Sequence, residues 1–177
     1  MLVFIAGVHG VGKGYLCSQA TDELNFLHKS ASGLIKEFGN IQLDTNKLTD
    51  NIDKNQLVLL AALRELKKTG QNILLDGHFS LISKEGTITP IGVEVFSDMS
   101  LDHIILISEP ETVIRERIYS RDGIDVKYNI EDLLNSEKEH AKKVASYLGI
   151  GLIELNSPSK EAFIATLKKL STRSSCA

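Results

Sequence analysis

A short glycine-rich segment near the amino terminus constrains the fold more than any other feature of this chain. Four glycines fall within eight residues, in the order Gly7-Val8-His9-Gly10-Val11-Gly12-Lys13-Gly14. The apolar run before it, at 2–6, is typical of a strand that is buried on both faces. After it, from 13 to 27, apolar residues recur at helical spacing. The sequence therefore predicts a buried strand, a tight turn and an amphipathic helix in direct succession.

This succession of elements is suited to binding phosphate groups. Glycine adopts backbone conformations that other residues avoid, so successive N–H groups of the turn can point inward at phosphate oxygens. The following helix adds unpaired N–H groups and the positive end of its dipole, and Lys13 adds a mobile positive charge. We therefore expect the phosphate loop (residues 7–14) to bind a nucleoside triphosphate, with a glycine turn that binds no ligand as the alternative. The residues expected to contact the nucleotide are Gly7, His9, Gly10, Val11, Gly12, Lys13, Gly14 and Tyr15.

Short apolar runs alternate with helical patterns over the rest of the chain, which is typical of a parallel sheet covered by helices. Further strands are predicted at 26–30, 72–76, 103–107 and 152–155, with a small hairpin at 79–91. Helices are predicted at 33–38, 53–68, 93–99, 110–119, from 129 or 132 to 148, and at 157–170. In the helix at 53–68, the residues expected to face inward are Leu57, Leu60, Ala61, Leu63 and Leu66. The polar, weakly patterned residues 39–53 are expected to be mobile.

Length and composition fit one ordinary globular domain over residues 1–177. The net charge of −3 gives no broad electrostatic reason to bind nucleic acid or an anionic membrane, so no extended nucleic-acid surface is expected. No apolar run approaches the ~20 residues that span a bilayer, and the amino-terminal residues lack the pattern of a signal peptide. Two cysteines, Cys17 and Cys176, cannot form a framework of disulfides, so a reducing cytoplasm is the expected location.

Asp76 ends the predicted strand at 72–76. In an open parallel sheet, ligands bind beyond the carboxyl ends of the strands. An acid at this position can hold the magnesium ion that bridges the phosphates, and a turn cap is the alternative role. His78 lies two residues later. It could act as a hydrogen-bond donor or as a base toward an acceptor hydroxyl, and a structural histidine at a strand end is the alternative.

Arg117 and Arg121 lie four residues apart, on one face of a predicted helix. Two guanidinium groups on one face suit a triphosphate, whose equatorial charge grows in the transition state. The alternative is a solvated basic face with Glu116 as a partner, and Arg115 is expected to face water. Residues 117–129 are expected to form a short lid that excludes water during transfer.

Four short motifs resemble those of the adenylate kinases and their P-loop relatives. These are the Gly-x-x-Gly-x-Gly-Lys-Gly loop, the Leu-Asp-Gly stretch that ends at Gly77, the Arg-x-x-x-Arg pair, and the segment at 30–36, which is similar to Ser-Thr-Gly-x-x-x-Arg. The Asp-x-His of Asp76 and His78 is similar to that of archaeal-type adenylate kinases. The resemblance implies a three-layer α/β P-loop NTPase fold with a five-stranded parallel sheet, ATP as donor and Mg²⁺ as cofactor. It implies that the catalytic residues are Lys13, Arg117, Arg121 and Asp76, with Asp76 also the metal ligand.

The resemblance also indicates an acceptor-binding insert over residues 31–56. Its expected contacts are Ser32, Gly33, Lys36, Gln56 and His78, with Gln56 either reading a base edge or remaining an ordinary exposed residue. The chain departs from the family at four places, the first of which is His9, where the family often has proline. Tyr15 replaces a threonine and would cover the site or pack, Lys36 replaces an arginine, and residues 78–80 replace a Phe-Pro-Arg that grips the acceptor phosphate.

The expected function is ATP-dependent transfer of the terminal phosphoryl group to a small acceptor. A nucleoside monophosphate is the acceptor that the family implies. Two alternatives stay open: a kinase for a nucleoside or another small hydroxyl compound, with Asp76 or His78 as base, and a nucleotide-dependent switch with slow hydrolysis. The sequence leaves the oligomeric state open.

Overall fold

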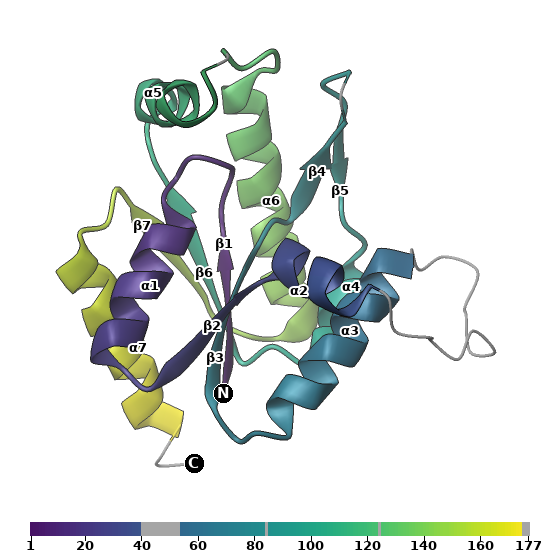
Figure 1. Ribbon diagram of the computed structural model, residues 1–177, viewed down its shortest axis with the longest axis vertical. Coiled ribbons are helices and arrows are strands. Elements are labelled where there is room, and N and C mark those ends of the chain that lie inside the picture. The colour runs from purple at the N-terminus through teal and green to yellow at the C-terminus, as the bar shows by residue number, and fades with distance from the viewer. Residues whose placement is uncertain (40–53, 84, 124, 175–177) are drawn as a thin grey trace.

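The computed structural model describes residues 1–39, 54–83, 85–123 and 125–174. Its centre is a five-stranded parallel sheet in the order β2-β3-β1-β6-β7 (Figure 1). The strands are β1 (Leu2–Ala6), β2 (Phe26–Ser30), β3 (Asn72–Gly77), β6 (His103–Ser108) and β7 (Leu152–Asn156). The predicted fold class, α/β with five parallel strands, is therefore confirmed. The expected mobile segment falls almost entirely on residues 40–53, which lie outside the described residues.

Helices cover both faces of the sheet and make three layers (Figure 1). On one side lie α1 (Lys13–Glu23) and α7 (Lys160–Ser174), and on the other lie α2 (Ala31–Phe38), α3 (Lys54–Lys67), α4 (Val93–Met99) and α6 (Ile130–Leu148). Two elements stand at the carboxyl end of the sheet, at the top of the view: α5 (Glu111–Asp122) and the antiparallel hairpin of β4 (Ser80–Ile82) and β5 (Ile88–Pro90). The hairpin matches the prediction. Among the described residues, no helix has the length and apolar character needed to cross a membrane.

The central strand β1 divides its side chains between two apolar cores. Leu2, Phe4 and Ala6 belong to the core under α2, α3, α4 and α6. Val3 and Ile5 belong to the core under α1 and α7. A parallel strand between two helical layers is buried on both faces, which explains why its sequence is apolar without alternation. Cys17, on α1, is buried in the second core as a free thiol, whereas Cys176 lies outside the described residues.

Three aromatic rings join β1 to the elements that follow β3. The ring of Phe4 meets Phe79 and Phe96 edge-on, with centroids 5.1 and 5.5 Å apart. Phe79 and Phe96 are themselves 4.8 Å apart. Edge-to-face pairs of this kind stabilise a core beyond the apolar area that they bury. The cluster fixes the position of the chain immediately after Asp76 and His78.

Some predicted boundaries and faces differ from the structure. The first helix ends at Glu23 rather than 27, because Leu24 is already extended and β2 pairs with β3 from Phe26 onward. The helix α2 starts at Ala31 rather than 33, because the Ser30 hydroxyl caps it by accepting a hydrogen bond from the Gly33 amide.

The predicted inward face of α3 was partly wrong. The structure buries Val58, Leu59 and Ala62, while Leu57 and Leu66 are only partly buried. Residues 57–63 are apolar all round the helix, so their spacing alone cannot say which stripe faces the sheet.

Replacing Phe4 by alanine tests the aromatic cluster. Because the ring is buried between two others, Phe4→Ala is expected to lower the free energy of unfolding by about 3–5 kcal/mol in urea denaturation. Leu81→Ala, at a side chain that is 55% exposed, is the control and is expected to change it by less than about 0.5 kcal/mol. Equal losses in the two variants would contradict this assignment of the core.

Candidate active site

The phosphate loop leaves the carboxyl end of β1 with glycines in left-handed conformations. Gly7 has φ of 145°, and a side chain there would place its Cβ 2.4 Å from the Ile107 carbonyl oxygen. Gly12, with φ of 94°, is the residue from which α1 begins. Both positions require glycine, since other residues rarely adopt these angles. The loop therefore exposes backbone instead of side chains at the start of α1.

The Lys13 ammonium group is folded into this loop. Lys13 is buried, and its Nζ donates hydrogen bonds to the carbonyl oxygens of Gly7, at 2.5 Å, and Val8, at 3.2 Å. Burial lowers its pKa from 10.5 to about 8, and the negative charges of Asp76 and Glu137 act in the opposite direction. Within the described residues, backbone carbonyls are the hydrogen-bond partners of this cation. An arriving anion can therefore take their place without breaking an ion pair.

The other loop residues divide into buried and exposed groups. The side chain of Val11 is buried in the core, so only its backbone can face a ligand. Gly14 is exposed and has open space around its Cα, and Tyr15 is 63% exposed. Tyr15 therefore does not pack into the core, which removes one of its two predicted roles and leaves covering of the site.

Asp76 is held by a histidine that the sequence did not indicate. His28 Nε2 and Asp76 Oδ2 lie 2.5 Å apart, and both side chains are mostly buried. His28 lies on β2, two residues before Ser30, which pairs in register with Asp76 on β3. Alternate residues of neighbouring strands share a face, so the contact could be found only once β2 and β3 are known to be neighbours.

Asp76 suits a magnesium ion that arrives with a nucleotide. Mg²⁺ is commonly held by one or two carboxylates together with water and substrate phosphates. Asp76 lies close enough to Lys13 for its charge to raise the lysine pKa. In the described part of the chain, no group of three or more His, Cys, Asp or Glu side chains could enclose a metal by itself. A cation here would therefore depend on the phosphates for its remaining ligands.

Two histidines face each other beside the loop. The ring centroids of His9 and His78 are 4.2 Å apart. Burial, followed by the charge of Lys13, lowers the pKa of His78 to about 2, so its ring is neutral near pH 7. Partial loss of water around the His9 ring, followed by the charge of Lys13, also lowers the pKa of His9, although the residue is exposed. A neutral His78 can exchange hydrogen bonds, but it does not replace the charge of the missing arginine.

The two predicted arginines both lie on α5 above the loop, with different surroundings. Arg117 donates to the Gly10 carbonyl oxygen and to Glu109, each at 3.2 Å, and therefore touches the loop itself. Arg121 makes an ion pair with Asp122 at 2.7 Å and is exposed, yet its charge contributes to lowering the His9 pKa. The carboxylates that they contact are thus those of Glu109 and Asp122.

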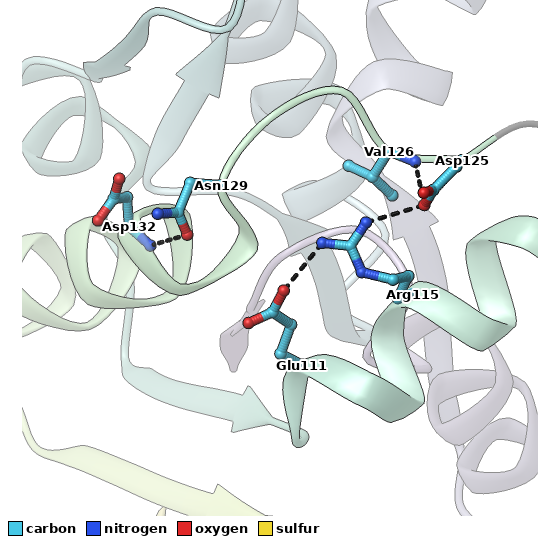
Figure 2. Close-up of polar contacts among 6 residues, drawn as sticks. All are labelled: Glu111, Arg115, Asp125, Val126, Asn129 and Asp132. Carbon is cyan, nitrogen blue, oxygen red and sulfur yellow. Dashed lines mark hydrogen bonds and ion pairs between the residues drawn. The ribbon is translucent and has the colours of Figure 1, made fainter.

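The prediction that Arg115 faces water is correct in part: its side chain is 39% exposed, but it also pairs with two acids. Figure 2 shows Arg115 between Glu111, at 2.9 Å, and Asp125, at 2.8 Å. Asp125 also accepts a hydrogen bond from the Val126 amide, and Asn129 caps α6 by accepting one from the amide of Asp132 (Figure 2). Arg115 therefore ties α5 to the connection that leads into α6, and the α6 start at 129 or 132 is resolved in favour of an Asn129 cap.

On the proposed acceptor side, the segment at 30–36 continues directly from β2. Ser32 and Lys36 are exposed on α2. A Cβ on Gly33 would lie 2.7 Å from the Ser30 hydroxyl oxygen, so this glycine makes room for the helix cap. Gln56 is partly buried, and its Oε1 is enclosed without a hydrogen-bond partner among the described residues. It is therefore not an ordinary exposed residue.

Glu137 is the central residue that the sequence reasoning missed. It is 1% exposed on α6, and its carboxylate accepts hydrogen bonds from three amides: Gly7 at 3.2 Å, Phe79 at 2.8 and 2.9 Å, and Ser80 at 2.9 Å. A signal was present, because Glu137 interrupts the apolar stripe that runs along α6 from Leu133 to Val144. A charged residue on such a stripe needs partners inside the protein.

Alanine substitutions at two loop glycines test the geometry of the loop. Gly7→Ala is expected to destabilise the protein by at least about 2 kcal/mol, because of its backbone angle and the collision with Ile107. Gly14→Ala meets nothing within 4 Å and replaces a glycine inside the first turn of α1, so it is expected to be neutral or to stabilise by up to about 1 kcal/mol. Thermal denaturation without ligand measures both, and a stable Gly7→Ala variant would contradict the loop conformation.

Comparison with known proteins places the chain in a family. A family model described as an AAA domain matches residues 6–133. Two curated relatives, each named cytidylate kinase, come from Sulfolobus acidocaldarius and Sulfurisphaera tokodaii. They are 24% and 22% identical to this chain over 88% of its length. The matched region spans 81% and 82% of the two relatives.

Solved structures agree on the fold. A sugar kinase from Janibacter sp. HTCC2649 is similar with a TM-score of 0.55 and 17% identity, over 94% of this chain and 91% of that one. Likeness at this level concerns the arrangement of helices and strands alone. Because the AAA-domain model matches most of its length, the chain belongs to that family. Together with the two curated relatives, this match identifies the chain as a phosphotransferase of the P-loop nucleoside monophosphate kinase family, whose motifs its own motifs resemble.

Proposed function

We propose that the protein transfers the terminal phosphoryl group of ATP to a nucleoside monophosphate, with cytidine monophosphate as the first candidate. The observation that carries the donor half is the buried Lys13 ammonium, whose hydrogen bonds go to loop carbonyls. Arg117 lies against the same loop from the other side. The names of the two curated relatives support the choice of acceptor.

In this proposal the chain acts by positioning and by neutralising charge. The loop amides and Lys13 hold the outer phosphates, and Arg117 and Arg121 face the charge that grows during transfer. Asp76 would hold the magnesium ion, which would supply positive charge against the phosphates. No covalent intermediate on the protein is required. Residues 117–129 serve as a short lid, whose link to α5 through Arg115 is seen in Figure 2.

The acceptor is proposed to bind against residues 31–56 and His78. Of the insert, residues 40–53 lie outside the described part of the chain. Among the described residues, the Oε1 of Gln56 has no hydrogen-bond partner, which supports an acceptor that donates a hydrogen bond, as the exocyclic amino group of cytosine does. Ser32, Gly33 and Lys36 would then lie toward the phosphate of the monophosphate.

One observation favours a second candidate, a kinase for an uncharged acceptor with a hydroxyl group. Residues 31–56 contain no arginine, the residue best suited to bidentate phosphate binding. At the same site, His28 holds Asp76, and His78 is neutral. A carboxylate oriented by a histidine can accept the proton of an attacking hydroxyl. The two candidates share the donor half and differ in the acceptor.

An acceptor panel separates these functions. Purified protein with ATP and Mg²⁺ is expected to form ADP fastest with cytidine monophosphate, and Lys13→Ala is expected to reduce that rate by about 100-fold or more. Lys142→Ala, at an exposed lysine paired with Glu139, is the control and should leave the rate unchanged.

Turnover only with nucleosides or small hydroxyl compounds would favour the second candidate. ATP hydrolysis that no acceptor accelerates would instead indicate a nucleotide-dependent switch.

The affinity for ATP is expected to depend on pH through Lys13. Phosphates bind the charged lysine, and in the free protein Lys13 loses its proton with a pKa of about 8. Binding above that pH therefore requires proton uptake, so affinity should fall by up to about tenfold per pH unit. Calorimetric titration from pH 7 to 10 measures this slope, with Lys13→Met as the control in which it disappears. A slope that persists in Lys13→Met would assign the titration to another group.

A further inference from the structure

The carboxylate of Glu137 connects two backbone segments on either side of Lys13. On one side it accepts from the amide of Gly7, the first residue of the phosphate loop. On the other it accepts from the amides of Phe79 and Ser80, which directly follow His78. The segments are about 70 residues apart in sequence and follow β1 and β3, which are neighbours in the sheet. Since Glu137 comes from α6, one side chain joins three elements at the carboxyl end of the sheet.

Both backbone polar groups of Gly7 are hydrogen-bonded to charged side chains. Its amide donates to Glu137, and its carbonyl oxygen accepts from Lys13. Loss of water raises the pKa of Glu137, while the three amide hydrogen bonds and the charge of Lys13 act to lower it. In turn, the charge of Glu137 raises the pKa of Lys13. The acid and the lysine therefore act on each other through space and through one shared residue.

We propose that Glu137 is a positioning residue of the phosphoryl-transfer site, which holds the phosphate loop and the turn after His78 in one arrangement and supplies negative charge opposite Lys13. The inference rests on the proposed use of ATP and is independent of the acceptor. It goes beyond a packing role because two separate effects converge on Lys13. One is the placement of the loop that encloses its ammonium group, and the other is the charge that this group experiences.

The geometry requires a carboxylate. Both oxygens accept from amides, with Oε1 shared by Gly7 and Phe79 and Oε2 by Phe79 and Ser80. A glutamine of the same shape has only one oxygen, so its NH₂ group would face backbone N–H groups that are also donors. Glu137→Gln therefore removes the charge and at least one set of contacts while keeping the volume of the side chain.

Several groups face Lys13 and share in its titration. They are Asp76 from β3, Glu137 from α6, Cys17 from its own helix, His9 from the loop and His78 from the turn. Asp76 and Glu137 both favour the charged lysine, and Asp76 has the larger effect. Removing Glu137 leaves Asp76 in place, so the pKa of Lys13 should fall further, while the larger of the two raising effects remains.

The test compares ATP binding by wild-type protein, Glu137→Gln and two controls across pH. Glu137→Gln is expected to weaken ATP binding by about tenfold at pH 7.5. The pH above which the affinity for ATP decreases should be lower in this variant than in the wild-type protein. The variant should also lower kcat more than it changes KM for the acceptor. Ser136→Ala removes the 2.9 Å contact with Ser80 Oγ at the same turn without changing charge. Glu139→Gln removes a charge at an exposed position of the same helix. Both controls should keep the wild-type pH profile.

The outcomes separate this inference from the proposed function. If Glu137→Gln only lowers thermal stability, and binds ATP with the wild-type affinity and pH profile, the positioning role is overturned. If wild-type protein fails to bind ATP at any pH, the proposed function fails and this inference with it.

A second measurement needs no variant. Hydrogen exchange of the wild-type protein should show that ATP protects the amides of Phe79 and Ser80 together with that of Gly7. Protection of Gly7 alone would also overturn the inference.

Discussion

The buried ammonium group of Lys13 is the constraint around which the carboxyl end of this sheet is organised. A cation out of water must find oxygen atoms, and here they are the carbonyls of the loop that carries it. These hydrogen bonds satisfy the ammonium group, yet an anion can replace them, because carbonyl groups hold a cation less strongly than a carboxylate does. Acids lie near it, at Asp76 and Glu137, without contacting it as ion-pair partners in the described residues. The loop is thus ready for an anion that offers more charge than the carbonyls do.

The helix α6 carries much of the support for that loop, although it enters the sequence more than a hundred residues later. Glu137 holds the loop and the β3–β4 turn, Ser136 meets Ser80, and His140 hydrogen bonds to the Ile91 carbonyl oxygen beside the Phe79 and Phe96 rings. The hairpin β4–β5 is therefore fastened to the same helix as the phosphate loop. A change at Glu137 is expected to reach the site through the backbone positions of Gly7, Phe79 and Ser80.

The donor and acceptor halves of the site differ in how strongly their residues point to a ligand. On the donor side, glycine angles, a buried lysine and Arg117 all converge on one loop. On the acceptor side, Ser32 and Lys36 are exposed, and Gly33 makes room for a helix cap. Within the part of the chain that the structure describes, Gln56 carries the one buried side-chain nitrogen or oxygen atom without a hydrogen-bond partner. The His28–Asp76 pair lies between the two halves, on β2 and β3. In the proposed function, this place would let the acid serve a magnesium ion on one side and an acceptor on the other.

The sequence alone was sufficient for the features that depend on neighbouring residues. Strand and helix patterns, the glycine loop and the Arg117/Arg121 spacing are local, so the five parallel strands, the order of elements along the chain and the hairpin were predicted correctly. Boundaries at 24 and 31 and the buried stripe of α3 depended on partners elsewhere, and there the predictions failed. The ion pairs of Arg115, whose side chain is partly exposed as predicted, were likewise not foreseen.

Only the tertiary structure revealed His28 beside Asp76 and Glu137 beneath the loop. Each contact joins residues from separate elements, at separations of 48 and 130 positions, that meet only once strand order and helix packing are set. The glycine-rich loop, which the sequence marked as a phosphate site, is therefore held in shape by residues that no local pattern connects to it. Backbone conformation is encoded locally by glycine and by periodicity, whereas the charges around Lys13 are brought together by the fold.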